Sequence, residues 1–217
     1  MGSSDWIGFS WLFKPKQRDP LELLELFLES ITEMVQVHSR SEDYNSYLRH
    51  TEKLRKNASK ALHHLKVFFT PISSTSSVSS TGTDLAKHEM MVIFTNEALN
   101  SETLEIICSH LELLDFESRK DAVALFACLI RKKFGSKYPA VEYLCQHPAI
   151  LDSLILGYEK SETALFYGIM LRDTLAFEAV LETLFESQYV FKLFDYAKLP
   201  TFDLASDAIA SLKVPFI

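Results

Sequence analysis

Glycine and proline are scarce in this chain, at six and seven of 217 residues. Both residues mark the turns of sheet-rich proteins, so their scarcity favours long helices over a sandwich or barrel. No apolar run approaches the roughly eighteen residues that a membrane-spanning helix needs, and we expect no membrane span. Hydrophobic residues still make up 47% of the chain, which is ample for a folded core.

Positive charge is also in short supply. The chain has 22 Lys and Arg residues against 29 Asp and Glu residues, which gives a formal net charge of −7. Binding to phosphate backbones needs a clearly basic surface. Nucleic acid is therefore not expected as a partner.

The motifs of common chemistry are missing as well. Cys108, Cys128 and Cys145 form no CxxC pair and lie in apolar helical patterns, which predicts reduced core thiols and a cytoplasmic location. The Cys and His spacings fit no metal site, and there is no phosphate-binding glycine loop and no nucleophile elbow. We expect no enzymatic activity, no catalytic residue, no metal and no cofactor.

The pattern along the chain predicts one long helical domain after a short arm. Residues 1–19, with apolar anchors such as Trp6 and Trp11, are predicted to form an irregular N-terminal arm. Asp19-Pro20 is a typical helix start, with an N-cap followed by proline at the first helical position. Residues 20–217 are predicted to form a single helical-repeat domain. Its Ser/Thr-rich loop at 70–83 has too little apolar surface to pack, and we expect it to be mobile.

One pattern occurs three times along the chain at a constant interval. Arg131, Arg172 and Lys213 each end an apolar helical segment, and an aliphatic residue precedes each of them. A small or β-branched residue lies eight positions before each, and an acid lies ten positions before each. The aliphatic residues are Ile130, Leu171 and Leu212, the small or β-branched residues are Val123, Ala164 and Ala205, and the acids are Asp121, Glu162 and Asp203.

A period of about 40 residues in an all-helical pattern is typical of an all-α armadillo or HEAT-like α-solenoid. Such folds stack helical repeats into a right-handed superhelix with a long groove. The repeats are expected to share a buried stripe, formed by Val123, Ala127 and Ile130 and their counterparts in the next two repeats. Gly168 lies in this stripe, in mid-helix, where glycine costs about 1 kcal/mol against alanine. Close helix packing would explain it.

The three basic residues have two interpretations. The first is compensation of the helix dipole at helix C-termini. The second is a basic ladder along the groove that meets an acidic partner. The candidate partner-binding residues are Lys120, Arg131, Arg172, Asp173, Asp207 and Lys213.

Several runs in consistent order resemble the calcium-binding protein 39 family, kinase scaffolds also called mouse-protein-twenty-five-like. They are Leu-Leu-Asp-Phe-Glu-Ser-Arg-Lys-Asp (113–121), Tyr-Pro-Ala-Val-Glu-Tyr-Leu (138–144), Gly-Ile-Met-Leu-Arg-Asp (168–173) and Thr-Phe-Asp-Leu-Ala-Ser-Asp-Ala (201–208). The resemblance spans nearly the whole chain and is weakest from 38 to 100.

The resemblance implies an armadillo-like scaffold that binds Ser/Thr kinases or pseudokinases of the sterile-twenty group through a concave face. Activation would be allosteric, because the scaffold prefers the active kinase conformation. Such signalling controls polarity and proliferation. Family members are longer, so the chain is expected to be C-terminally shortened, and no residue of the family's pocket for a partner's C-terminal tail can be carried over.

Two alternatives stay open. The chain could be a divergent paralogue that no longer activates a kinase and competes with one that does, or a solenoid that binds another protein or a basic peptide. A solenoid end without a polar cap would also expose apolar side chains and promote self-association. The side chains concerned are Leu212, Val214, Phe216 and Ile217.

Overall fold

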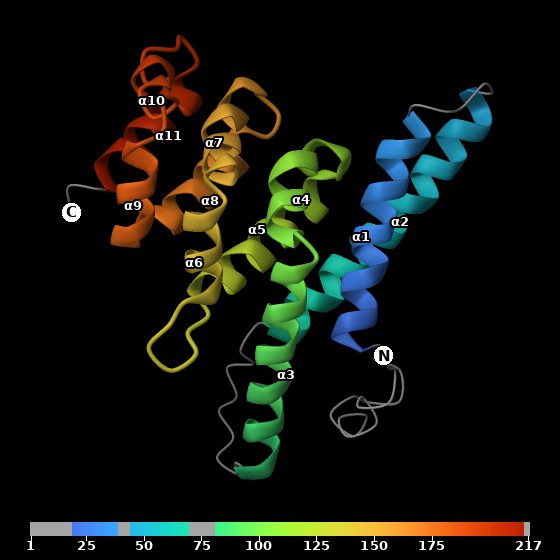
Figure 1. The fold of residues 1–217 in the computed structure, drawn as a ribbon. Helices are drawn as coiled ribbons and strands as arrows, with labels where there is room; N and C mark the ends of the chain where they lie inside the picture. The colour runs from blue at the N-terminus through green and yellow to red at the C-terminus, as the bar shows by residue number, and fades with distance from the viewer. Residues whose placement is uncertain (1–18, 39–43, 70–80, 215–217) are drawn as a thin grey trace. The chain divides into compact units, whose positions relative to one another are not determined.

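The computed structural model describes residues 19–38, 44–69 and 81–214, and the chain divides into two compact units, Met1–Ser101 and Glu102–Ile217. In the described residues the regular secondary structure is helical, apart from one isolated bridge between Phe134 and Lys137 (Figure 1). The expected all-α fold is confirmed. Within those same ranges, no helix combines the length and apolar character that crossing a bilayer requires.

The first unit contains α1 (Pro20–His38), α2 (Tyr44–Phe69) and α3 (Thr81–Asn100). The backbone N–H of Leu21 donates to Asp19 Oδ1 at 2.9 Å, so the predicted Asp19-Pro20 helix start is confirmed. Helices α1 and α2 pack through a shared apolar stripe. Its fully buried members include Leu24, Phe27, Ile31, Ala58, Leu62 and Leu65.

Two predictions about the first unit concern residues that lie largely outside the described ranges. The predicted arm at 1–19 lies outside them except for Asp19. Helix α3 begins at Thr81, inside the predicted loop at 70–83, and residues 70–80 of that loop also lie outside the described ranges. The ring of Phe69 packs on Phe94 of α3 with 4.4 Å between centroids.

In the second unit, two short helices separate each long helix from the next. In chain order these are α4 (Thr103–His110), α5 (Phe116–Arg131), α6 (Pro139–Gln146), α7 (Pro148–Leu156), α8 (Ala164–Leu175), α9 (Glu178–Phe185), α10 (Lys192–Tyr196) and α11 (Phe202–Lys213). Two 3-10 turns, η2 (Leu111–Leu113) and η3 (Gly157–Glu159), extend α4 and α7.

Helices α5, α8 and α11 follow one another through the second unit, and α8 packs against both of the others. The shorter helices pair in the same order, because α4 packs on α7 and α6 packs on α9. The constant interval in the sequence therefore has a geometric meaning. Arg131 and Lys213 are the last residues of α5 and α11, and Arg172 lies in the last turn of α8, so the three residues occupy corresponding ends of helices in successive repeats.

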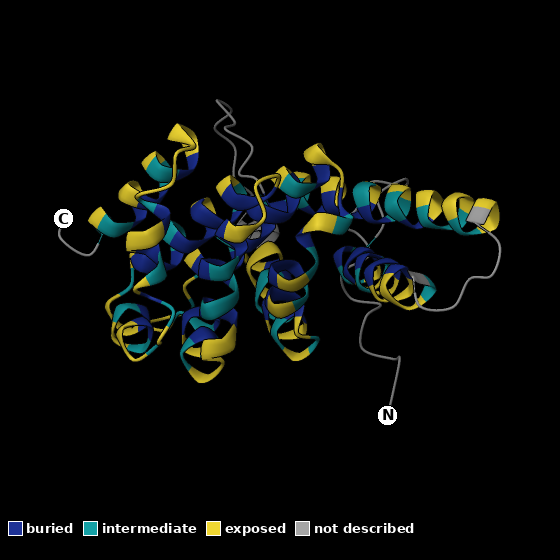
Figure 2. Ribbon diagram, turned by 90° about the horizontal axis from the view of Figure 1, so that it is seen from above, coloured by how far each residue is buried: buried dark blue, intermediate teal, exposed yellow. Residues whose placement is uncertain are grey.

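The predicted buried stripe holds on α8, where Ala164, Gly168 and Leu171 are buried. On α5 Val123 and Ile130 are buried but Ala127 is only half-buried. On α11 the prediction is wrong, because Ile209 is 41% exposed and Ala205 and Leu212 are half-buried. Helix α8 is covered on both sides by α5 and α11, whereas α11 packs mainly on α8 and α10 and no helix follows it in the described ranges. Buried residues accordingly concentrate where helices face one another (Figure 2).

Candidate partner-binding surface

Arg172 and Asp207 form a two-pronged ion pair between α8 and α11. Nη1 of Arg172 donates to Asp207 Oδ2 at 2.8 Å, and Nη2 lies 2.8 Å from Asp207 Oδ1. Nη1 also donates to Ser211 Oγ at 3.0 Å. The Arg172 side chain is 25% exposed and that of Asp207 14%. A bidentate, mostly buried pair of this kind is stronger than an ordinary surface contact.

Tyr158, from turn η3, completes this network. Its hydroxyl donates to Asp207 Oδ2 at 2.6 Å and lies 2.9 Å from Ser211 Oγ. Burial, and then the hydrogen bond to Asp207, raise the pKa of Tyr158 above its ordinary value, so the phenol stays protonated and can donate. Its ring stacks on Tyr196 of α10, which ties η3, α8, α10 and α11 together.

Gly168 lies beside this network, and its lack of a side chain makes room for the Asp207 carboxylate and the Tyr158 hydroxyl. A Cβ atom added there would lie 1.8 Å from Asp207 Oδ2 and 2.5 Å from the Tyr158 hydroxyl. The sequence suggests close packing as the reason for this glycine. The structure supports that reason and identifies the approaching groups as a carboxylate and a phenol.

Arg131, the counterpart of Arg172 one repeat earlier, pairs with Asp173 between α5 and α8. The acids are not counterparts, because Asp173 lies in the last turn of α8 and Asp207 lies in the middle of α11. Arg131 is 66% exposed and Asp173 14%. Two of the three cations in the predicted ladder therefore already have a carboxylate partner within the molecule. Lys213 is exposed, and its side chain forms no ion pair within the described ranges.

Lys120 lies apart from these pairs, on the first turns of α5. Its ammonium contacts Glu117 Oε1 at 2.9 Å and sits 4.6 Å from the centre of the Phe116 ring. The structure thus brings together Arg131 with Asp173 and Arg172 with Asp207. It gives Lys120 a local partner on its own helix.

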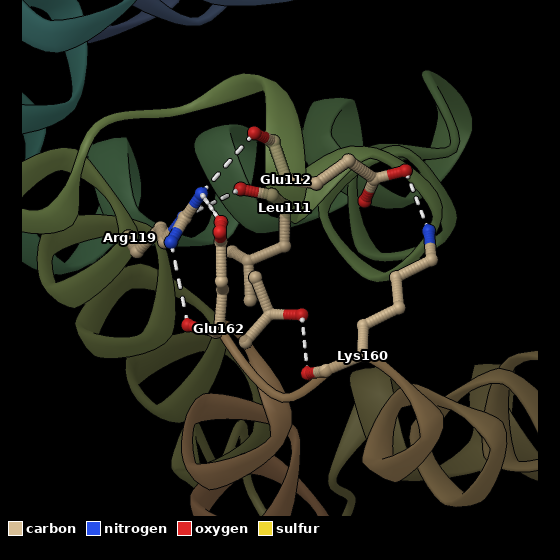
Figure 3. Close-up of polar contacts among 6 residues, drawn as sticks. Leu111, Glu112, Arg119, Lys160 and Glu162 are labelled. Atoms are coloured by element: carbon tan, nitrogen blue, oxygen red, sulfur yellow. Dashed lines mark hydrogen bonds and ion pairs between the residues drawn. The ribbon is translucent and has the colours of Figure 1, made fainter.

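Sequence reasoning missed Arg119, which lies between the turns of two repeats (Figure 3). Its guanidinium donates to the carbonyl oxygens of Leu111 at 3.2 Å, Glu112 at 3.2 Å and Glu162 at 3.3 Å. The side chain is only 12% exposed. Beside it, Lys160 pairs with Glu112 at 2.7 Å. No spacing within one helix signals such a contact, because its acceptors are backbone groups up to 43 residues away.

Replacing Arg119 with lysine should lower the free energy of unfolding by about 1 kcal/mol, because one ammonium group cannot reach three carbonyl oxygens in different directions. Urea unfolding followed by circular dichroism measures the change. The neighbouring control is Lys120→Met, which removes an exposed ion pair and should stay within about 0.5 kcal/mol of wild type. Equal effects of the two changes would contradict the assigned role of Arg119.

A small hollow lies between α8 and α11, with a volume of about 280 Å³. Leu165, Phe202, Asp203, Ser206, Asp207 and Ala210 line it. Phe202 is 81% exposed, and Leu165 and Ile169 of α8 are each 42% exposed. Around the buried Arg172–Asp207 pair the surface is therefore partly apolar, with an acidic residue at its rim. We call Leu165 and Phe202, the two exposed apolar side chains that line this hollow, the α8–α11 apolar surface.

The first unit has a larger hollow of about 650 Å³ along α1. Its lining combines carboxylates with the leucines of α1, and the carboxylates include Glu22, Glu25, Glu29 and Glu97. In the described part of the chain, no group of three or more His, Cys, Asp or Glu side chains is placed to hold a metal ion.

In the second unit, equivalent helices of successive repeats pack on one another in order. This stacking is typical of an armadillo-like helical-repeat protein. The chain belongs to the Mo25-like family, whose model matches residues 11–217. Relatives named calcium-binding protein 39-like in Mus musculus and Homo sapiens are each 29% identical over 202 residues, which cover 93% of this chain and 54% of theirs. MO25-like protein 2 of Caenorhabditis elegans is 34% identical over 126 residues, 58% of this chain and 37% of its own. The chain spans about half the length of the mammalian relatives.

Proposed function

We propose that this chain is a non-catalytic scaffold that binds a Ser/Thr kinase or pseudokinase of the sterile-twenty group and favours its active conformation. The observation that supports the binding face is the α8–α11 apolar surface, with Phe202 81% exposed beside a hollow. Membership of the Mo25-like family supports the scaffold role. We place this activity in the cytoplasm, in intracellular signalling.

Burial of Phe202 against a partner would supply much of the binding energy. Moving a phenylalanine side chain out of water is worth about 1.5–3 kcal/mol, and aromatic residues are common binding hot spots. The network of Arg172, Asp207 and Tyr158 keeps α11 fixed against α8, so little conformational entropy is lost when a partner docks. A rigid face is also what allosteric activation requires, because a scaffold can shift a kinase only by its differential affinity for two kinase states.

Binding and activation are separate parts of the proposal, since the chain spans about half the length of its mammalian relatives. A face on α8 and α11 suffices for docking. A tenfold shift toward the active kinase state needs about 1.4 kcal/mol of further differential contact. Binding without activation would fit a divergent paralogue that acts as a competitor.

Phe202→Ala should weaken binding to a sterile-twenty-type kinase domain at least about tenfold, because the anchor of the apolar surface is lost. The dissociation constant is measured by fluorescence anisotropy, after light scattering on a sizing column has shown a defined complex. Phe191→Ala is the matched control. Phe191 is also highly exposed, at 68%, but precedes α10, and its loss should change affinity less than about twofold.

A kinase activity assay on the same samples separates the alternatives. Binding with increased activity supports the whole proposal, and binding without it supports the competitor. If the chain ignores the kinase but binds another protein or a basic peptide through Phe202, the kinase part is wrong. The same column run on the chain alone tests self-association. Leu212 and Val214 are half-buried in the structure, while Phe216 and Ile217 lie outside the described residues.

A further inference from the structure

A tight hairpin connects α5 to α6. The N–H of Phe134 donates to the carbonyl of Lys137 at 2.9 Å, and the N–H of Lys137 donates back at 3.1 Å. Gly135, at the tip, has φ = 62°, a left-handed conformation that glycine adopts without strain. The paired backbone and the short loop give this connection a defined shape.

Positive charge is concentrated on this hairpin. Residues 131–137 contain one Arg and three Lys and no carboxylate, in a chain whose net charge is −7. Arg131 is paired with Asp173. Lys132, Lys133 and Lys137 form no ion pair within residues 19–38, 44–69 and 81–214. We call these three residues the basic hairpin.

One of these lysines, Lys133, lies over an aromatic ring. The ammonium of Lys133 lies 5.4 Å from the centre of the Tyr138 ring, within the range of a cation–π contact. Tyr138 in turn packs against Phe177, which precedes α9, with 5.0 Å between ring centres. The contact holds the charge of Lys133 near the hairpin and leaves it exposed to a partner.

We propose that the basic hairpin binds an acidic segment of a protein partner, a run of Asp and Glu residues. Charge complementarity is the main argument, because three cations without a carboxylate partner in the described ranges stand on one rigid turn of an acidic molecule. The hairpin is an additional contact surface, because it lies at the α5–α6 connection while Phe202 lies on α11. The proposal does not depend on the identity of the kinase.

Two other polyanions fit less well. An extended nucleic acid would reach past three lysines onto an acidic protein, where like charge repels it. Binding to an anionic membrane would be stabilised by only about 1 kcal/mol for each lysine. The tip residues Gly135 and Ser136 have no apolar side chain that could insert into the bilayer. A short acidic peptide needs only the area that the hairpin presents.

The test uses the full chain and a fluorescein-labelled peptide of ten glutamates, with a neutral Gly-Ser peptide as reference. The triple variant Lys132→Gln, Lys133→Gln and Lys137→Gln should bind the glutamate peptide at least about tenfold more weakly than wild type. Wild-type binding should also weaken strongly between about 50 mM and 500 mM NaCl. The matched control is Lys53→Gln, Lys60→Gln and Lys87→Gln, which removes the same charge from exposed positions and should change affinity less than about twofold.

Circular dichroism and thermal unfolding verify that both triple variants remain folded, as expected for side chains that are exposed or half-buried. A loss specific to the hairpin variant supports the proposal. Equal losses in the two variants would mean that only net charge matters and would overturn it. Absence of wild-type binding to the glutamate peptide, or binding only to phosphatidylserine vesicles or to oligothymidine, would overturn it as well.

Discussion

Arg172→Ala should lower the free energy of unfolding by about 3 kcal/mol. This is the largest effect that we expect from any partly exposed residue in this chain. The substitution leaves Asp207, which is 14% exposed, without its bidentate partner. It also removes the hydrogen bond from Nη1 to Ser211 Oγ, a group with no access to solvent. Urea unfolding monitored by circular dichroism gives the difference, provided that the slope with urea is unchanged.

Arg131→Ala is the matched control, because Arg131 holds the corresponding position one repeat earlier. Its side chain is 66% exposed, so solvent and salt screen its pairing with Asp173. We expect a loss of about 1 kcal/mol or less. If Arg172→Ala has the free energy of unfolding of the wild type but binds kinase poorly, then Arg172 contacts the partner and does not stabilise the packing of α11 on α8.

Gly168→Ala should destabilise the chain by about 2 kcal/mol, although alanine is the better helix former by about 1 kcal/mol. The new methyl group would overlap Asp207 Oδ2, at 1.8 Å, and crowd the Tyr158 hydroxyl, at 2.5 Å. Either the carboxylate moves away from Arg172 or α11 moves away from α8. The melting temperature and urea midpoint should both fall.

A double-mutant cycle with Asp207→Ala tests this cause. Removing the carboxylate first opens the space, so Gly168→Ala should then cost less than half of what it costs in the wild-type chain. Additive effects would show that the network is not what requires glycine. A more stable Gly168→Ala chain would show that helix propensity dominates at this position.

The sequence predicts helices in the second unit because the signals for them are local. The apolar period, Pro139 at a helix start and Asp115 as an N-cap all act within a few residues. Ser101, just before α4, is a residue type that caps helices, but its hydroxyl donates to Glu97 O at 2.7 Å, at the end of α3, and Glu102 is the N-cap residue of α4. Both uses satisfy the same hydroxyl group, and only the backbone path decides between them.

The exposed Ile209 shows where periodicity alone reaches its limit, because the pattern of the stripe predicts that it is buried. A helical repeat with apolar residues in the correct positions predicts burial for the whole stripe, because the pattern is the same in each repeat. Burial, however, depends on a neighbour on each side. On α11 the main neighbours in the described ranges are α8 and α10, so the same pattern leaves Ile209 exposed.

The sequence by itself determined that the chain is helical, that its repeats are evenly spaced and which residues occupy equivalent positions, because each of these depends on spacing along the chain. Only the tertiary structure decided which charges are already paired. Arg172 meets Asp207 across 35 residues and Arg131 meets Asp173 across 42, whereas three lysines of one hairpin meet no carboxylate in the described ranges. Charges pair by proximity in space, and that proximity exists only once successive helices have packed.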